Sequence, residues 1–356
     1  MSDLGDRGAA ARRPTFATEL NRRDLVLGAT ALGLAGPGVS AASAAPPRRI
    51  DVHFHVLPPE YLFEAPAAGS VQLPFARTRE ASLEEMDRNG VAVSMLSFPT
   101  PFFWFSGIEP GRRLARLCND YYAGLVRWRP KRFGLFAALP PLEDTEGVLR
   151  EIAYAYDTLG ANGVTLMTNY SGRYLGDELF APIWQELNRR KAVVFVHPSN
   201  APCCTAVNDG VGVGYGEFPF DTARTIMNLW LRDALADRPD VRIIFSHGGG
   251  ALPMIADRID KFGRPGPMGA PLVHDAHAFI GKLYFDIANA AAPSALPSVR
   301  EMASPQHILF GSDFPYVPIS RGLDYLAQAG LKSEDVSAIE RGNALALLPQ
   351  LHAMAG

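Results

Sequence analysis

Short apolar segments alternate with longer amphipathic segments along most of this chain. Eight of the apolar segments have the length and composition of buried strands: 50–53, 91–98, 133–139, 163–167, 193–197, 242–246, 283–286 and 308–311. Between them lie stretches such as GRRLARLCNDYYAGLVRW and ELFAPIWQELNRRK, in which apolar residues recur every three or four positions, as in a helix. Strand and helix that alternate eight times predict a (β/α)8 TIM barrel, which is an α/β fold.

The chain divides into a leader and one barrel domain. We assign residues 46–356 to the barrel, because barrels of this kind often exceed the roughly 100–200 residues of a typical domain. Residues 1–45 have the organisation of a signal peptide: Arg22 and Arg23 precede a mildly apolar run that ends in small residues at 42–44. The arginine pair predicts a twin-arginine signal and export to the periplasm. A disordered leader on a cytoplasmic protein is the alternative.

The composition favours a globular protein that acts on small molecules. The formal net charge is -3 and the pI is near 6.3, so no excess of basic residues indicates a nucleic-acid or membrane partner. Cys118, Cys203 and Cys204 are too few for a disulfide framework or a zinc site made of several cysteines.

Histidine and aspartate side chains occur at the ends of four predicted strands. His53 and His55 close the first segment, and because strand side chains alternate between faces, both imidazoles face the same side. His197, His247 and Asp313 end the fifth, sixth and eighth segments. In a barrel, all strands deliver their last residues to one face, so these five side chains are expected to converge. Histidines that only form capping hydrogen bonds are the alternative for the first pair.

Three imidazoles and one carboxylate make a suitable ligand set for one divalent ion. We predict that His53, His55, His197 and Asp313 bind Zn²⁺, with Mn²⁺ as the alternative, and leave a coordination position open. A site for two metal ions would usually have a lysine at the end of the fourth strand, where this chain has Met167 and Thr168 instead. One ion is therefore expected. His247 is then available as an acid, a base or a group that orients the substrate.

The sequence resembles the amidohydrolase superfamily, and within it the branch of metal-dependent, non-oxidative decarboxylases. The motifs that carry this resemblance are IDVHFHVLP, FVHPSN, FSHGGGALP, GSDFP and GNALALL, and further segments such as LMTNYSGRYLGD are similar to those of 6-methylsalicylate decarboxylases. The branch also includes aminocarboxymuconate-semialdehyde and hydroxybenzoate decarboxylases. The resemblance implies that His53, His55, His197 and Asp313 hold the metal and that His247 assists the chemistry. It leaves open whether His247 or Asp313 donates the proton.

The substrate expected from this resemblance is a small aromatic acid of the salicylate type, such as 6-methylsalicylate. Phe98 and Trp104, in the aromatic loop SFPTPFFWF, are predicted to line its pocket, with packing against a neighbouring loop as the alternative. Arg77 and Arg79 lie in the long loop after the first strand and are candidate anchors for the substrate carboxylate. Arg258 corresponds to an arginine that in the semialdehyde decarboxylase reaches the neighbouring subunit's site, which implies a homodimer or higher homo-oligomer.

Two other functions are compatible with parts of this pattern. A metal-dependent hydrolase of a lactone or amide would use the wider superfamily's chemistry, but the missing lysine and the decarboxylase-like segments argue against it. A periplasmic binding protein would have no need for five polar side chains on one face of a barrel.

Overall fold

The computed structural model describes residues 49–64, 78–100, 102–103, 107–201, 203, 216–263 and 275–355. The predicted leader and its boundary near residue 45 lie outside these residues. In the described part of the chain, no helix is both long and apolar enough to cross a bilayer.

Eight parallel strands form the centre of the fold, in the order β1-β2-β3-β4-β7-β8-β9-β10. Their bounds are β1 Arg49–Phe54, β2 Val91–Leu96, β3 Phe133–Ala138, β4 Gly163–Met167, β7 Val193–His197, β8 Arg242–Phe245, β9 Tyr284–Asp286 and β10 Ile308–Leu309. The last strand returns to the first: the N–H of Val52 donates to the carbonyl of Phe310 at 3.0 Å, and Phe54 bridges Phe314 in parallel. This arrangement is a nearly closed barrel and confirms the predicted (β/α)8 fold.

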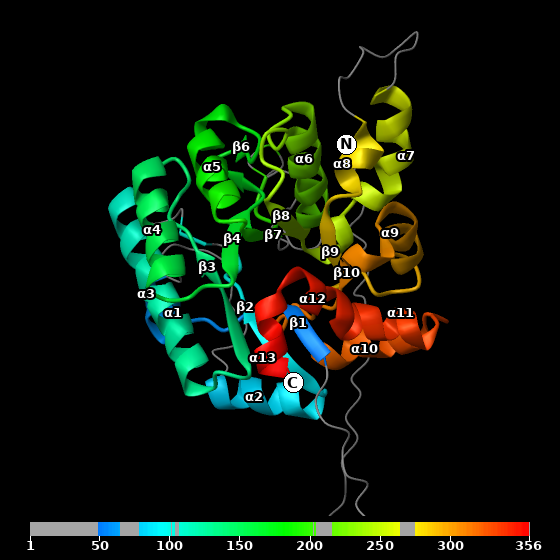
Figure 1. Ribbon diagram of the computed structural model, residues 1–356, viewed down its shortest axis with the longest axis horizontal. Helices are drawn as coiled ribbons and strands as arrows, with labels where there is room; N and C mark the ends of the chain where they lie inside the picture. Colours follow the sequence, from blue (N-terminus) through cyan, green and yellow to red (C-terminus); the bar gives the residue numbers. More distant parts are fainter. Residues whose placement is uncertain are drawn as a thin grey trace, which may run out of the picture. The chain divides into compact units, whose positions relative to one another are not determined.

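Helices form a layer outside the strands (Figure 1). Those in the first half of the barrel are α1 Pro59–Glu64, α2 Arg79–Arg88, α3 Ile108–Trp128, α4 Thr145–Asp157 and α5 Ala181–Arg189. The second half contains α6 Glu217–Leu231, α7 Leu252–Gly263, α8 Ala276–Ile280, α9 Leu296–Met302 and α10 Ile319–Gln328, and the chain continues with α11 Ser333–Ser337, α12 Asn343–Leu347 and α13 His352–Ala355. A short antiparallel pair, β5 Asn169–Tyr170 and β6 Arg173–Tyr174, follows β4.

The strands are buried on both faces, which explains why they read as continuous apolar runs rather than alternating ones. One cluster of buried residues fills the barrel interior and includes Val52, Phe136, Phe195 and Ile244. The same cluster contains Leu347 and Leu351, so the C-terminal segment that includes α12 covers one end of the interior. The catalytic chemistry expected of a barrel belongs to the opposite end, at the carboxyl ends of the strands.

Gly163, the first residue of β4, shows how tightly the strands approach one another. A Cβ atom at this position would lie 2.3 Å from the carbonyl oxygen of Val193 and 2.9 Å from the ring of Phe136. Backbone atoms cannot move aside as a flexible side chain can, so any larger residue here would force β4 away from β7.

Candidate metal centre

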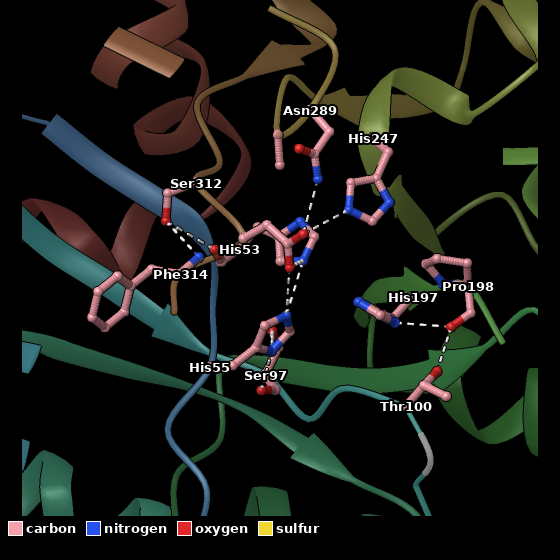
Figure 2. Close-up of polar contacts among 12 residues, drawn as sticks. His53, His55, Ser97, Thr100, His197, Pro198, His247, Asn289, Ser312 and Phe314 are labelled. Carbon is pink, nitrogen blue, oxygen red and sulfur yellow. Dashed lines mark hydrogen bonds and ion pairs between the residues drawn. The ribbon is translucent and has the colours of Figure 1, made fainter. Parts of the chain in front are cut away.

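Five polar side chains converge at the carboxyl ends of the barrel strands. His53 lies in β1, His55 follows it, His197 ends β7, and His247 and Asp313 lie just beyond β8 and β10. Figure 2 shows the four histidines pointing toward one another from their separate elements. The centroid of the His53 ring lies 4.8 Å from that of His55, 5.4 Å from that of His197 and 5.0 Å from that of His247. The convergence predicted from the strand ends is therefore present.

The carboxylate of Asp313 divides its two oxygens between different partners. Oδ1 lies 3.2 Å from Nε2 of His53 and 3.3 Å from Nε2 of His55. Oδ2 lies 3.3 Å from Nε2 of His247 and accepts a hydrogen bond of 2.9 Å from the amide of Asn289. One oxygen thus faces the pair of β1 histidines, and the other faces the histidine predicted to assist the chemistry.

Hydrogen bonds at the outer side of three rings determine which nitrogen faces the centre. Nδ1 of His55 donates to the carbonyl of Ser97 at 2.8 Å, and Nδ1 of His197 donates to the carbonyl of Pro198 at 2.9 Å (Figure 2). Nδ1 of His53 lies 3.0 Å from Oδ2 of Asp286. Because carbonyl and carboxylate oxygens only accept, each Nδ1 carries a hydrogen, and each Nε2 is the atom that faces the centre and has the lone pair when the ring is neutral.

Two buried carboxylates, those of Asp286 and Asp313, favour a positive charge at the centre. Burial lowers the pKa of His53, but the charges of Asp286 and Asp313 outweigh burial and raise the pKa to about 10. Burial lowers the pKa of His55 below its usual value, and burial with the neighbouring imidazoles holds the pKa of His197 well below it. A metal ion can replace the proton on His53, and metal binding requires neutral imidazoles such as those of His55 and His197.

The donor set therefore fits a divalent metal ion. Nε2 of His53 and Nε2 of His55 are 3.0 Å apart, a hydrogen-bond distance that the proton on His53 can bridge when no metal is bound. A metal ion that binds both nitrogens takes the place of that proton. His53, His197, His247 and Asp313 each place one ligand atom so that all four lie within 4.8 Å of one another. His55 lies in hydrogen-bond range of two members of this set. The geometry thus brings His247 as near as the four predicted ligands, and their separate roles stay a prediction.

An unusual backbone conformation brings two side chains to one oxygen of a third, Oδ2 of Asp313. His247, Asn289 and Asp313 follow successive barrel strands, and all have positive φ values, of 56°, 54° and 65°. Residues other than glycine adopt this conformation at a cost of order 1–3 kcal/mol, and it concentrates at functional sites. Gly311 permits the same crowding, because a Cβ atom there would lie 2.9 Å from His53 and from Asp286.

Two polar residues of the centre were not selected from the sequence. Asp286 is the last residue of β9 and is fully buried against His53. The strand-end rule that identified His197 would have found it, because Asp286 also ends an apolar segment. Asn289 lies three residues beyond the strand and is exposed, so no pattern in the sequence distinguishes it from other loop residues.

For the predicted substrate-binding residues, Phe98, Trp104 and Arg258, the structure gives no contact with the centre within the described residues. Phe98 is fully buried among aromatic residues, with ring centroids 4.6 Å from that of Tyr61 and 5.0 Å from that of Phe103. Its role as a pocket wall stays a prediction. Trp104 lies outside the described residues. Arg258 lies on the exposed side of α7, and its proposed reach into a neighbouring subunit is not tested by a single chain.

The remaining candidates are placed as follows. Arg79, in α2, stacks over the ring of Trp128 in α3 at 4.6 Å and pairs with Glu80 at 2.8 Å, so its guanidinium contacts these two helices. Cys203 is exposed. Arg77 and Cys204 lie outside the described residues. At the end of β4, the hydroxyl of Thr168 bonds to Ser199 at 3.0 Å and to the buried carboxylate of Asp221.

Comparison with known proteins gives one consistent result. Residues 50–350 match a family described as amidohydrolase. The chain is similar to the 6-methylsalicylic acid decarboxylase of Penicillium expansum, with 37% identity over 85% of this chain and 97% of that protein. It is also similar to decarboxylase yanB of Aspergillus niger, with 36% identity over 85% of this chain and 88% of the other.

A solved structure shows the same fold. A dihydroxybenzoic acid decarboxylase from Polaromonas, with bound manganese and the inhibitor 2-nitroresorcinol, superposes with a TM-score of 0.76 at 22% identity, over 85% of this chain and 97% of that one.

Proposed function

Because the chain belongs to the amidohydrolase family, within its branch of metal-dependent decarboxylases, we propose that it removes CO₂ from a salicylate-type aromatic acid without oxidation. The substrate that we propose is 6-methylsalicylate or a close analogue, as the name of the 37% identical relative suggests. The single observation that supports the chemistry best is the divided carboxylate of Asp313, with one oxygen toward His53 and His55 and the other toward His247.

The proposed reaction exchanges CO₂ for a proton on one ring carbon. The ring carbon that bears the carboxylate gains a proton, the bond to the carboxylate carbon breaks, and the electrons of that bond restore aromaticity as CO₂ leaves. A divalent ion bound by the histidines and Asp313 would supply Lewis acidity toward the carboxylate and phenolate oxygens of the substrate. His247 Nε2 and Asp313 Oδ2, which lie 3.3 Å apart, are the two candidate proton donors.

We propose Zn²⁺ as the resident ion, with Mn²⁺ as the alternative. A centre rich in imidazole suits zinc, whereas a carboxylate and substrate oxygens also suit manganese. The manganese in the Polaromonas decarboxylase supports the alternative. Elemental analysis of protein purified without added metal should find one ion per chain. Two tightly bound ions, together with turnover of lactones or amides, would support the hydrolase function instead.

The leader is part of a separate proposal, which is export through the twin-arginine pathway. Changing both Arg22 and Arg23 to lysine should leave the precursor in the cytoplasm, because that pathway recognises the arginine pair. Fractionation followed by immunoblotting measures the distribution, and the unmodified chain is the control. A doubly substituted chain that still reached the periplasm in full would contradict the proposal.

A further inference from the structure

One buried carboxylate contacts both the metal-binding histidine of β1 and the loop that carries His247. Asp286 is the last residue of β9, and none of its surface is exposed. Its Oδ2 accepts from Nδ1 of His53 at 3.0 Å. Its Oδ1 accepts two backbone N–H groups, that of His247 at 3.2 Å and that of Ala288 at 2.9 Å.

We propose that Asp286 is a positioning residue that sets the tautomer of His53 and anchors the backbone of His247. The proposal rests on the proposed function, because it concerns residues of the same metal centre. A carboxylate carries no hydrogen, so the hydrogen between Oδ2 and Nδ1 belongs to His53. In the neutral ring that binds a metal, the lone pair is therefore fixed on Nε2, the atom that lies 3.2 Å from Asp313. Partners of this kind orient ligands and raise their basicity.

The second contact acts on the opposite side of the centre. His247 has a φ of 56°, a conformation that a residue with a side chain adopts only when its surroundings hold it there. The bond from the His247 N–H to Oδ1 of Asp286 is one such restraint, and it fixes the imidazole on the side of Oδ2 of Asp313. Asp286 thus aligns a metal ligand with the residue predicted to handle the proton.

Asp286→Asn is nearly isosteric, and it keeps the contacts with the two backbone N–H groups while it changes the contact with His53. The two backbone N–H groups require an acceptor, so the amide oxygen takes the place of Oδ1 and the amide NH₂ faces His53. Nδ1 of His53 must then accept, its hydrogen moves to Nε2, and that hydrogen blocks the metal. We expect D286N to bind Zn²⁺ about 10–100-fold more weakly than the wild type, the usual cost of losing such a partner.

The measurement is competition with a chromophoric chelator, with Zn²⁺ added to metal-free protein whose fold is checked by circular dichroism. Asp275→Asn is the matched control. Its side chain caps α8, by accepting the N–H of Ala278 at 3.1 Å, and an amide oxygen can accept the same bond. D275N should bind zinc as the wild type does. Zinc affinity of D286N within twofold of the wild type would overturn the proposal.

A second measurement needs no variant at position 286. Ring ¹⁵N NMR of the zinc-loaded wild-type protein should show a hydrogen on Nδ1 of His53 and zinc on Nε2, with the signal assigned by its loss in His53→Gln. Zinc bound through Nδ1 would refute the assignment even if D286N failed to fold. If the wild type bound no metal at all, the proposed function would fail. Metal binding by the wild type and D286N alike would remove only the present inference.

Discussion

His53→Ala is expected to abolish metal binding and decarboxylation together. His53 contacts three other residues of the centre: its Nε2 lies 3.0 Å from Nε2 of His55 and 3.2 Å from Oδ1 of Asp313, and its Nδ1 bonds to Asp286. Loss of a ligand should weaken zinc binding by more than the roughly 10–100-fold cost of losing a hydrogen-bond partner of a ligand. Without the ion, the substrate loses its Lewis acid, and turnover should fall below detection.

The barrel itself should survive this substitution. The centre lies at the carboxyl ends of the strands, whereas stability in this fold depends mainly on the packed interior and on the opposite face. Elemental analysis, circular dichroism and CO₂ release measure the three expected results. His277→Ala is the control, because His277 is an exposed histidine of α8, away from the strand ends. A His53→Ala protein with full metal content and activity would refute the assignment.

His247→Ala is expected to keep the metal and the fold but to lower turnover by about 10²-fold or more, the scale of a positioned acid–base group. The reason is that His247 contacts the outer oxygen of Asp313, at 3.3 Å, rather than the oxygen that faces His53 and His55. Binding of an unreactive salicylate analogue should weaken much less than turnover does.

The comparison of metal content with turnover distinguishes the possible roles of His247. Joint loss of metal and activity would make it a ligand, as its place within 4.8 Å of the ligand atoms of His53, His197 and Asp313 also allows. Unchanged turnover would make it a structural histidine and would assign proton transfer to Asp313.

The sequence predicted the order of the barrel strands well, because buried parallel strands leave a strong apolar signal. Strand ends were less predictable. The sixth and eighth strands were expected at 242–246 and 308–311 but end at Phe245 and Leu309. In both places the chain leaves the sheet early and soon adopts a positive φ, at His247 and Asp313, to aim a polar side chain. The demands of the site override the local preference for strand.

The hairpin after β4 was not predicted, although its turn has a recognisable cause. Ser171 and Gly172 both have positive φ values, of 51° and 83°, as a two-residue type I′ turn requires. The flanking strands have only two residues each, which is too short for an alternating pattern to appear.

The metal centre was predictable where histidine ended a strand and not where other polar residues support it. His53, His55 and His197 stand out in the sequence because imidazole is uncommon after an apolar run. The acceptors that orient two of these rings are the carbonyls of Ser97 and Pro198, and a backbone group leaves no trace in residue identity. Contacts of this kind depend on how the loops fold around the centre, which a single sequence does not specify.

The most direct test of the central claim is the fate of 6-methylsalicylate with the metal-loaded protein. We expect CO₂ and 3-methylphenol in equal amounts, loss of both on treatment with a chelator, and recovery on addition of Zn²⁺ or Mn²⁺. Absence of CO₂ from 6-methylsalicylate and from a panel of other hydroxybenzoates, with metal bound and the barrel folded, would contradict the account.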